Sequence, residues 1–138
     1  MKIVVTYRPA RDVGTDLLIV PVAQHGVRRT LTTLIARFRL RGEHSIRDFS
    51  GKENESLLLY GGRSGPKRVA FVGLGATPED RESVRRAAAK GASVAKDLEV
   101  GSVAWDLQSG EAALSARDVV EGFVLGGYRF ERYRTGKG

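Results

Sequence analysis

Residues 73–75, Gly-Leu-Gly, come nearest to a phosphate-binding loop in this sequence. They follow an apolar stretch and precede the predicted start of a helix, where free backbone amides can bind an anion. The third glycine of the dinucleotide-binding pattern is absent, because Pro78 takes its place. Glu79 and Asp80 follow and would repel a phosphate group. We therefore interpret the two glycines as a tight turn between a strand and a helix, and keep phosphate binding as the weaker alternative.

No set of residues has the spacing of a catalytic or metal-binding site. The chain has no cysteine, and its two histidines, His25 and His44, lie on opposite sides of a predicted helix. A zinc or two-metal site needs three or more ligands at one point. The aspartates lie on separate predicted elements: Asp12, Asp16, Asp48, Asp97, Asp106 and Asp118. We expect no catalytic residue, no metal ligand and no cofactor in this chain.

The sequence lacks two short motifs that are typical of nucleotide binding and of ester hydrolysis. Residues 51–55, Gly-Lys-Glu-Asn-Glu, lack the Gly-Lys-Ser/Thr ending of a P-loop and predict a loop before a strand. No Gly-x-Ser-x-Gly nucleophile elbow occurs.

Trp105 lies in an alternating apolar segment, so we predict a core position for it rather than a role in stacking on bases.

Basic residues gather in two stretches of a chain whose formal net charge is +7. Between positions 28 and 47, six arginines stand against one glutamate, and residues 129–137 carry four basic residues against one glutamate. We define the basic patch by the arginines around the first predicted helix: Arg28, Arg29, Arg37, Arg39 and Arg41. Such a patch attracts phosphate backbones or an acidic protein surface. A solvated helix face is the simpler interpretation, and nucleic-acid binding is the alternative.

The elements that must position these residues alternate between strands and helices. Apolar runs predict strands at 2–7, 16–22, 56–60, 67–73 and 102–107. Helical spacing of apolar residues predicts helices at 30–40, 77–98 and 111–126. Thr30 and Thr77 are the predicted N-caps, with Pro78 in the first turn. This order favours an α/β sandwich in which a mixed sheet lies between helices.

The two later helices have predicted buried faces. In the helix at 77–98 this face comprises Val84, Ala87, Ala88, Val94, Ala95 and Leu98. In the helix at 111–126 it comprises Ala113, Ala116, Val120, Phe123 and Val124.

The C-terminal stretch combines aromatic and basic residues, as interface anchors do. Tyr128, Phe130, Arg132 and Tyr133 are candidate interface residues, with packing inside the chain as an equal alternative. We expect one domain at 1–133, and at 134–138 the start of an interdomain linker or the end of an excised piece. No apolar run approaches the roughly 20 residues that span a bilayer, and no signal peptide is evident. We expect a cytoplasmic protein without membrane contact.

Several motifs, in this order, resemble the N-terminal domain of the leucyl (cytosol) aminopeptidase family. They are 16–22 (DLLIVPV), 49–55 (FSGKENE) with the leucine strand after it, 68–75 (RVAFVGLG), the alanine-rich helix from 85, and 120–135 (VEGFVLGGYRFERYRT). Together they cover nearly the whole chain. Asn54 departs from the pattern, since glycine is more usual there, and the stretch after Gly26 is short and rich in arginine.

This resemblance implies a macro-domain-like three-layer sandwich without catalytic residues. In the family, a C-terminal domain binds two divalent metals, usually zinc or manganese, and removes N-terminal residues from peptides in a hexamer. Its Asn-Thr-Asp-Ala-Glu-Gly-Arg signature is absent from these 138 residues. The chain alone is therefore not expected to be an enzyme, although the resemblance implies a parent protein that is.

The same resemblance implies partners and leaves two other functions open. The implied partners are the chain's own catalytic domain and other subunits of a homo-oligomer. The first alternative is a nucleic-acid-binding module that uses the basic patch. The weaker one is ADP-ribose or nucleotide binding at residues 73–75, which rests on analogy with macro domains alone.

Overall fold

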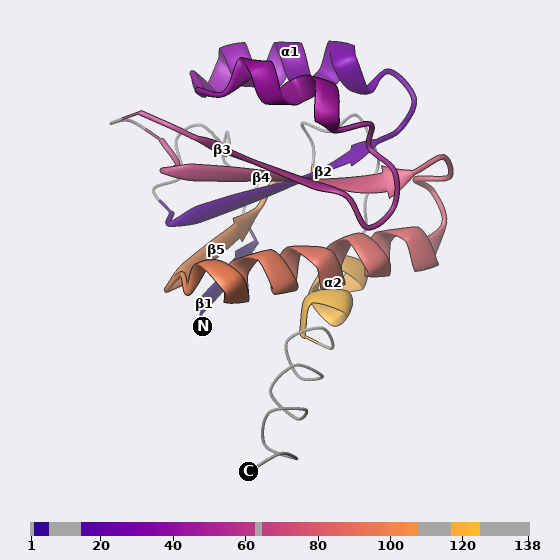
Figure 1. Cartoon of the computed structure of the whole chain (residues 1–138). Helices are drawn as coiled ribbons and strands as arrows, with labels where there is room; N and C mark the ends of the chain where they lie inside the picture. Colours follow the sequence, from indigo (N-terminus) through magenta and orange to yellow (C-terminus); the bar gives the residue numbers. More distant parts are fainter. Residues whose placement is uncertain (1, 6–14, 63–64, 108–116, 125–138) are drawn as a thin grey trace.

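The computed structural model describes residues 2–5, 15–62, 65–107 and 117–124. Its centre is a five-stranded sheet of order β1-β5-β2-β4-β3 (Figure 1). The strands are β1 (Lys2–Val5), β2 (Leu17–Ala23), β3 (Ser56–Tyr60), β4 (Arg68–Gly75) and β5 (Ser102–Trp105). The first four in this spatial order run parallel, and β3 pairs antiparallel with β4 at one edge. The predicted mixed sheet is confirmed.

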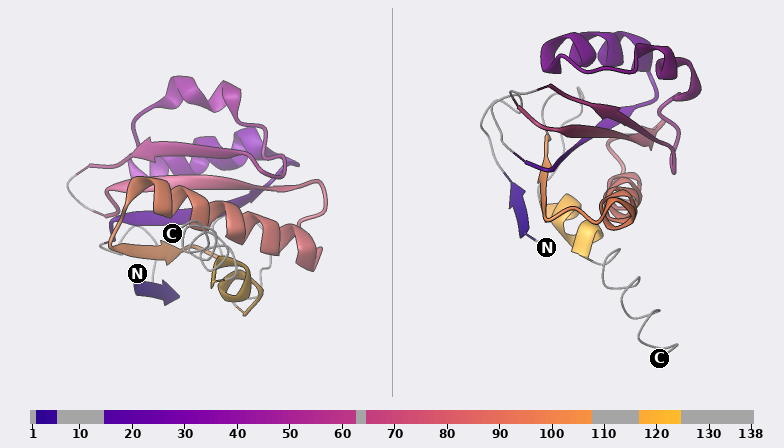
Figure 2. Two further views of the ribbon diagram at one scale, coloured as in Figure 1. Left: turned by 60° about the horizontal axis from the view of Figure 1, so that its bottom comes forward. Right: turned by 60° about the vertical axis from the view of Figure 1, so that its left-hand side comes forward.

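Helices cover both faces of this sheet. α1 (Val27–Phe38) and the short 3₁₀ helix η2 (Glu43–Asp48) lie over one face. α2 (Arg81–Leu98) and a helical segment at 117–124 lie over the other (Figures 1 and 2). The result is the predicted three-layer sandwich. The sequence analysis missed η2, whose six residues are too few to show a helical period.

The alternation of side chains along β2 explains why both faces need a cover. Leu17 and Ile19 pack toward α2, whereas Leu18 and Val20 pack toward α1, and all four are at most 1% exposed. Successive side chains of a strand point to opposite faces, so an uninterrupted apolar run requires packing on both sides. The apolar run at 16–22 is therefore the central strand of the sheet.

The start of α1 differs from the prediction. Thr30 is not the N-cap: it lies in the first turn, 5% exposed, and its backbone N–H donates to the Gly26 carbonyl at 3.1 Å. Gly26 is the N-cap, with φ of 70°. Glycine adopts this left-handed conformation without steric cost, so the chain can turn directly from β2 into the helix.

The start of α2 also differs. Thr77 does not cap this helix; its carbonyl accepts the Asp80 N–H at 3.0 Å in a turn that contains Pro78. Asp80 is the N-cap, and its Oδ1 accepts the Glu82 N–H at 3.1 Å. Both residue types cap helices, and aspartate does so more often than threonine. Here the turn closed by Thr77 and Asp80 comes before the helix, so Asp80 is the residue at its first turn.

The buried faces of the helices are largely as predicted. Val84, Ala87, Ala88 and Ala95 are buried, and Val94 and Leu98 are partly buried. The segment 117–124 instead buries Val119 and Phe123, spaced i and i+4, and leaves Val124 51% exposed. The prediction of Val124 as an inward residue is therefore wrong, and Val120 is only half-buried. Ala113 and Ala116 lie outside the described residues.

Candidate functional site

The helical segment 117–124 docks closely on α2. A Cβ atom on Gly122 would lie 2.8 Å from the Ala88 Cβ, so the two helices approach as only glycine permits. Phe123 is 3% exposed and meets Trp105 edge to face, with ring centroids 5.7 Å apart. Burial of one phenylalanine contributes about 1.5–3 kcal/mol, so packing supplies most of the stability of this contact.

Ion pairs between the segment 117–124 and α2 orient the segment on the helix. Arg81 pairs with the largely buried carboxylate of Asp118 at 3.2 Å, and Arg85 pairs with Glu121 at 3.1 Å. Within the segment, Arg117 also reaches Glu121 at 3.1 Å. Partly exposed pairs contribute about 0–1 kcal/mol each. They therefore fix the rotation of the segment more than they stabilise it.

The segment 50–55 lies along the end of β4 and occupies its glycine amides. The Gly73 N–H donates to the Glu55 carbonyl at 3.0 Å, and the Gly75 N–H donates to the Gly51 carbonyl at 2.9 Å. Both amides are thus unavailable to a phosphate group, and this argues against phosphate binding through them. The predicted tight turn is also wrong, because both glycines belong to β4.

Close approach explains why these two positions are glycine. A Cβ atom on Gly73 would collide with the Lys52 carbonyl oxygen and lie 2.7 Å from the Gly51 carbonyl carbon. Gly75 has φ of 78°, and a Cβ atom there would lie 2.8 Å from the Glu53 Cγ. The glycine motif thus makes room for the loop 50–55 and not for a ligand.

Glu55 closes that loop from within. Its Oε1 accepts the Ser50 N–H at 3.0 Å, the Ser50 hydroxyl at 2.8 Å and the Lys52 N–H at 3.1 Å. These bonds, led by that of the Ser50 hydroxyl, lower the pKa of Glu55. Asn54 has φ of 68°, a conformation that glycine adopts freely and asparagine tolerates. This conformation suits the asparagine found here and also the glycine that the family resemblance leads us to expect at this position.

Glu53 joins the loop to α2. Its Oε1 accepts the Ser83 hydroxyl at 2.9 Å, and its Oε2 accepts Arg86 Nη1 at 3.0 Å. Both contacts, the Ser83 bond first, lower the pKa of Glu53, so this carboxylate is charged at neutral pH.

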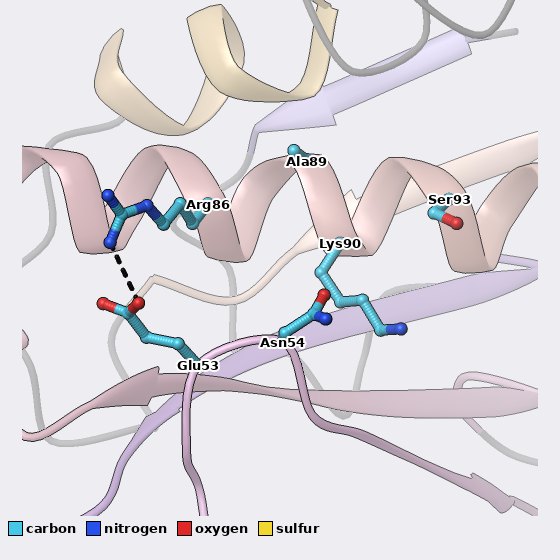
Figure 3. A pocket seen from close by; sticks show the side chains of 6 residues that line it. All are labelled: Glu53, Asn54, Arg86, Ala89, Lys90 and Ser93. Atoms are coloured by element: carbon cyan, nitrogen blue, oxygen red, sulfur yellow. Dashed lines mark hydrogen bonds and ion pairs between the residues drawn. The ribbon is translucent and has the colours of Figure 1, made fainter.

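A cavity of about 330 Å³ lies beside this ion pair (Figure 3). It is lined by Glu53, Asn54, Arg86, Ala89, Lys90 and Ser93. The sequence analysis missed it. The only signal was the spacing of positions 86, 90 and 93, which places three polar residues on one side of a helix; the partner loop could not be inferred.

All five arginines of the basic patch are exposed. Arg28, Arg29 and Arg37 lie on the outer side of α1, and Arg39 and Arg41 follow its end. α1 contains no acidic residue, and no patch arginine forms an ion pair within the described ranges. Arg41 Nη2 donates to the Gly61 carbonyl at 3.5 Å. The structure thus leaves these arginines in solvent around α1 and just after its end.

The remaining candidate residues are dispersed. His25 is exposed, and Asp106 and Asp118 are buried, the latter against Arg81. Among residues 2–5, 15–62, 65–107 and 117–124, no three His, Cys, Asp or Glu side chains are grouped so as to hold a metal ion. Within the same ranges, no helix is long and apolar enough to cross a membrane. The side chain of His44, Asp12, and the predicted interface of Tyr128, Phe130, Arg132 and Tyr133 lie outside the described residues.

The sequence matches the model of the "Cytosol aminopeptidase family, N-terminal domain" over residues 44–137. The chain belongs to this family. It is 32% identical to a probable cytosol aminopeptidase of Chlorobium luteolum and 36% identical to one of Syntrophotalea carbinolica. Each alignment covers 99% of the chain but only 28% and 29% of the relative. This domain thus spans less than a third of the length of these two relatives.

Solved structures agree on the fold of this aminopeptidase-family domain. A tomato leucine aminopeptidase mutant superposes with a TM-score of 0.67 at 22% identity, over 92% of this chain and 28% of that one. The macrodomain of Mycobacterium tuberculosis DarG superposes with a TM-score of 0.60 at 16% identity, over 94% and 91% of the two chains. Both identities support the fold alone, and the macro-like architecture is confirmed.

The close approach at Gly73 predicts a large loss of stability in the aminopeptidase-family domain. We expect Gly73→Ala to lower the free energy of unfolding by about 3 kcal/mol, because its methyl group meets the backbone of Gly51 and Lys52, which cannot move away without breaking the hydrogen bonds between this loop and β4. Gly62→Ala is the control, since a Cβ atom there meets nothing within 4 Å; it should change stability by less than about 0.5 kcal/mol. Urea unfolding of both variants measures the difference. Equal stabilities would contradict the close approach.

The ion pairs that Asp118 and Glu121 form with Arg81 and Arg85, here called the clamp on α2, predict a loss of stability in acid. The hydrogen bond from Arg117 and the charges of Arg117 and Arg85 lower the pKa of Glu121 in the folded domain. Its contribution to stability is therefore full above the unfolded pKa of about 4.3 and is lost as the pH falls through the lower folded pKa.

Glu121→Gln should accordingly show a smaller fall in Tm between neutral pH and pH values below about 4.3 than the unmodified domain does. Glu79→Gln, at an exposed glutamate outside the clamp, should follow the unmodified curve. Thermal unfolding monitored by circular dichroism across this range makes the comparison. Parallel curves for all three proteins would refute the role of Glu121.

Proposed function

We propose that this chain is the non-catalytic N-terminal domain of a leucyl aminopeptidase that releases N-terminal amino acids from peptides. The observation that carries the proposal is the family match together with the 28–29% of each relative that the chain spans. Those relatives bear the name cytosol aminopeptidase. The two divalent metals, zinc or manganese, would be bound by a catalytic domain outside these 138 residues.

We propose further that the domain packs against that catalytic domain and supports oligomer assembly in the cytoplasm. The docking of 117–124 supports this role, because the segment leads into the candidate interface of Tyr128, Phe130, Arg132 and Tyr133 from a fixed place on α2. The domain would extend over 1–133, with 134–138 opening the linker. In this role the segment 117–124 is the mount on which the catalytic domain is attached.

A peptidase assay tests whether activity requires a catalytic domain outside this chain. The purified 138-residue chain should release no p-nitroaniline from leucine p-nitroanilide with added Mn²⁺ or Zn²⁺, whereas a longer gene product that contains it should do so. Turnover by the purified chain alone would overturn the proposal.

The mounting role is tested in that longer product. Gly122→Leu should shift it toward smaller species in sedimentation velocity, because the added side chain displaces 117–124 from α2. Gly62→Leu adds the same volume in open space and should leave the sedimentation profile unchanged. Identical profiles for the two variants would count against the mount.

A second candidate function is binding of nucleic acid through the basic patch. The observation that favours it is the exposure of all five arginines around a helix without acidic residues. Arginines that are not engaged with carboxylates are available to phosphate oxygens. Each phosphate contact releases counterions, so binding of this kind weakens steeply with salt.

Replacement of Arg37, Arg39 and Arg41 by alanine tests this candidate. If all three contact phosphates, the slope of log K against log salt concentration should become shallower by about 2 to 3. Replacement of Lys52, Lys67 and Lys90 by alanine removes the same charge elsewhere and controls for net charge. Fluorescence anisotropy with a labelled DNA duplex measures both. No binding at about 50 mM salt, or equal slopes, would exclude the patch as a nucleic-acid site.

A further inference from the structure

The cavity beside the Glu53–Arg86 ion pair has the volume of a small-molecule site and a largely polar lining. Its volume of about 330 Å³ falls at the lower end of the range for ligand pockets, about 300–1,000 Å³. Glu53 and Asn54 line it from the loop, whereas the other lining residues come from one side of α2 (Figure 3). Loop and helix are held together by the bonds that Glu53 receives from Ser83 and Arg86, so the two sides of the cavity keep their places relative to each other.

Several polar groups of the lining are available to a ligand. The Lys90 ammonium, the Asn54 amide and the Ser93 hydroxyl form no hydrogen bond or ion pair with the described part of the chain. Glu53 also has capacity left, because a carboxylate accepts about four hydrogen bonds and only those from Ser83 and Arg86 engage it. The cavity thus offers acceptors on its loop side and donors on its helix side.

The order of charges decides which class of ligand fits. In Figure 3, Glu53 and Arg86 point toward each other, and Lys90 and then Ser93 follow along the helix. A ligand with only negative charge would meet the Glu53 carboxylate, and one with only positive charge would meet Arg86 and Lys90. Like charges in close contact are costly, whereas a molecule with one group of each sign pairs with both sides.

We propose that this cavity binds a small zwitterion, a short peptide or a free α-amino acid, with its ammonium group on Glu53 and its carboxylate on Lys90. In Figure 3 the Lys90 ammonium and the Glu53 carboxylate lie on opposite sides of Asn54. A short peptide therefore suits the arrangement better, and a free amino acid requires the Lys90 side chain to turn toward Glu53. Ser93 and Asn54 supply the further hydrogen bonds to the carboxylate. The site lies within this domain and needs no catalytic residue. If the proposed function holds, its ligand belongs to the same chemical class as the peptides and amino acids that the parent handles, and the domain can respond to their concentration.

Titration of the ¹⁵N-labelled 138-residue chain, followed by NMR, tests the proposal without the parent. L-alanine and L-alanyl-L-alanine carry both charges at different separations, so they distinguish a free amino acid from a peptide as the ligand. At least one should give saturable shift changes centred on residues 53, 54, 90 and 93. N-acetyl-L-alanine, which lacks the ammonium, and L-alaninamide, which lacks the carboxylate, should bind about tenfold more weakly or not at all.

A variant at Lys90 assigns the effect to the cavity. Lys90→Gln should weaken binding about tenfold, since it removes a charged hydrogen-bond partner of the carboxylate. Lys67→Gln removes one charge at the far end of β4 and should leave the affinity unchanged. Three results would overturn the proposal: no saturable change with either zwitterion, equal changes with the blocked analogues, or unchanged affinity in Lys90→Gln. None of these results depends on peptidase activity, so failure here is separate from failure of the proposed function.

Discussion

Burial of the sheet on both faces is the constraint on which the rest of this structure depends. The side chains of β2 alternate between two apolar layers, and neither layer is closed without a helix above it. The parallel pairing of β2 with β4 and β5 requires crossover connections long enough to hold such helices. α1 and α2 therefore follow from the strands, and every surface discussed above is defined by one of these helices.

Small residues then set how closely the peripheral parts approach this frame. Gly73 and Gly75 admit the loop 50–55 against β4, and Gly122 admits 117–124 against α2. These contacts are made by backbone and carbon atoms, and the charged groups around them add orientation. Glu53 and Glu121 have the same role at these two contacts, which we call seams: the loop 50–55 against α2 and the segment 117–124 against α2. Each carboxylate accepts hydrogen bonds from arginine at a seam that packing already closes. The charged side chains along these seams remain partly open to solvent.

The sequence predicted the sandwich and most of its elements because apolar periodicity is a local property. Trp105 was expected in the core and is 1% exposed there, and the α2 face was largely correct. Errors arose where more than one residue could cap a helix, as with Thr77 and Asp80 at the start of α2, or where a motif was interpreted without its spatial neighbour. The Gly-Leu-Gly motif is the clearest case: its glycines are required by Lys52 and Glu53, some twenty residues earlier in the chain.

The sequence by itself determined the fold class, the family and the gathering of arginines near α1, because each depends on residue type and order along the chain. Only the tertiary structure decided which amides of β4 are occupied and how 117–124 is held on α2. It alone also brought Glu53 and Asn54 opposite Lys90 to form a cavity. These features depend on contacts between distant segments. A distance of a few ångströms between a loop and a helix follows from packing, and no local pattern encodes it.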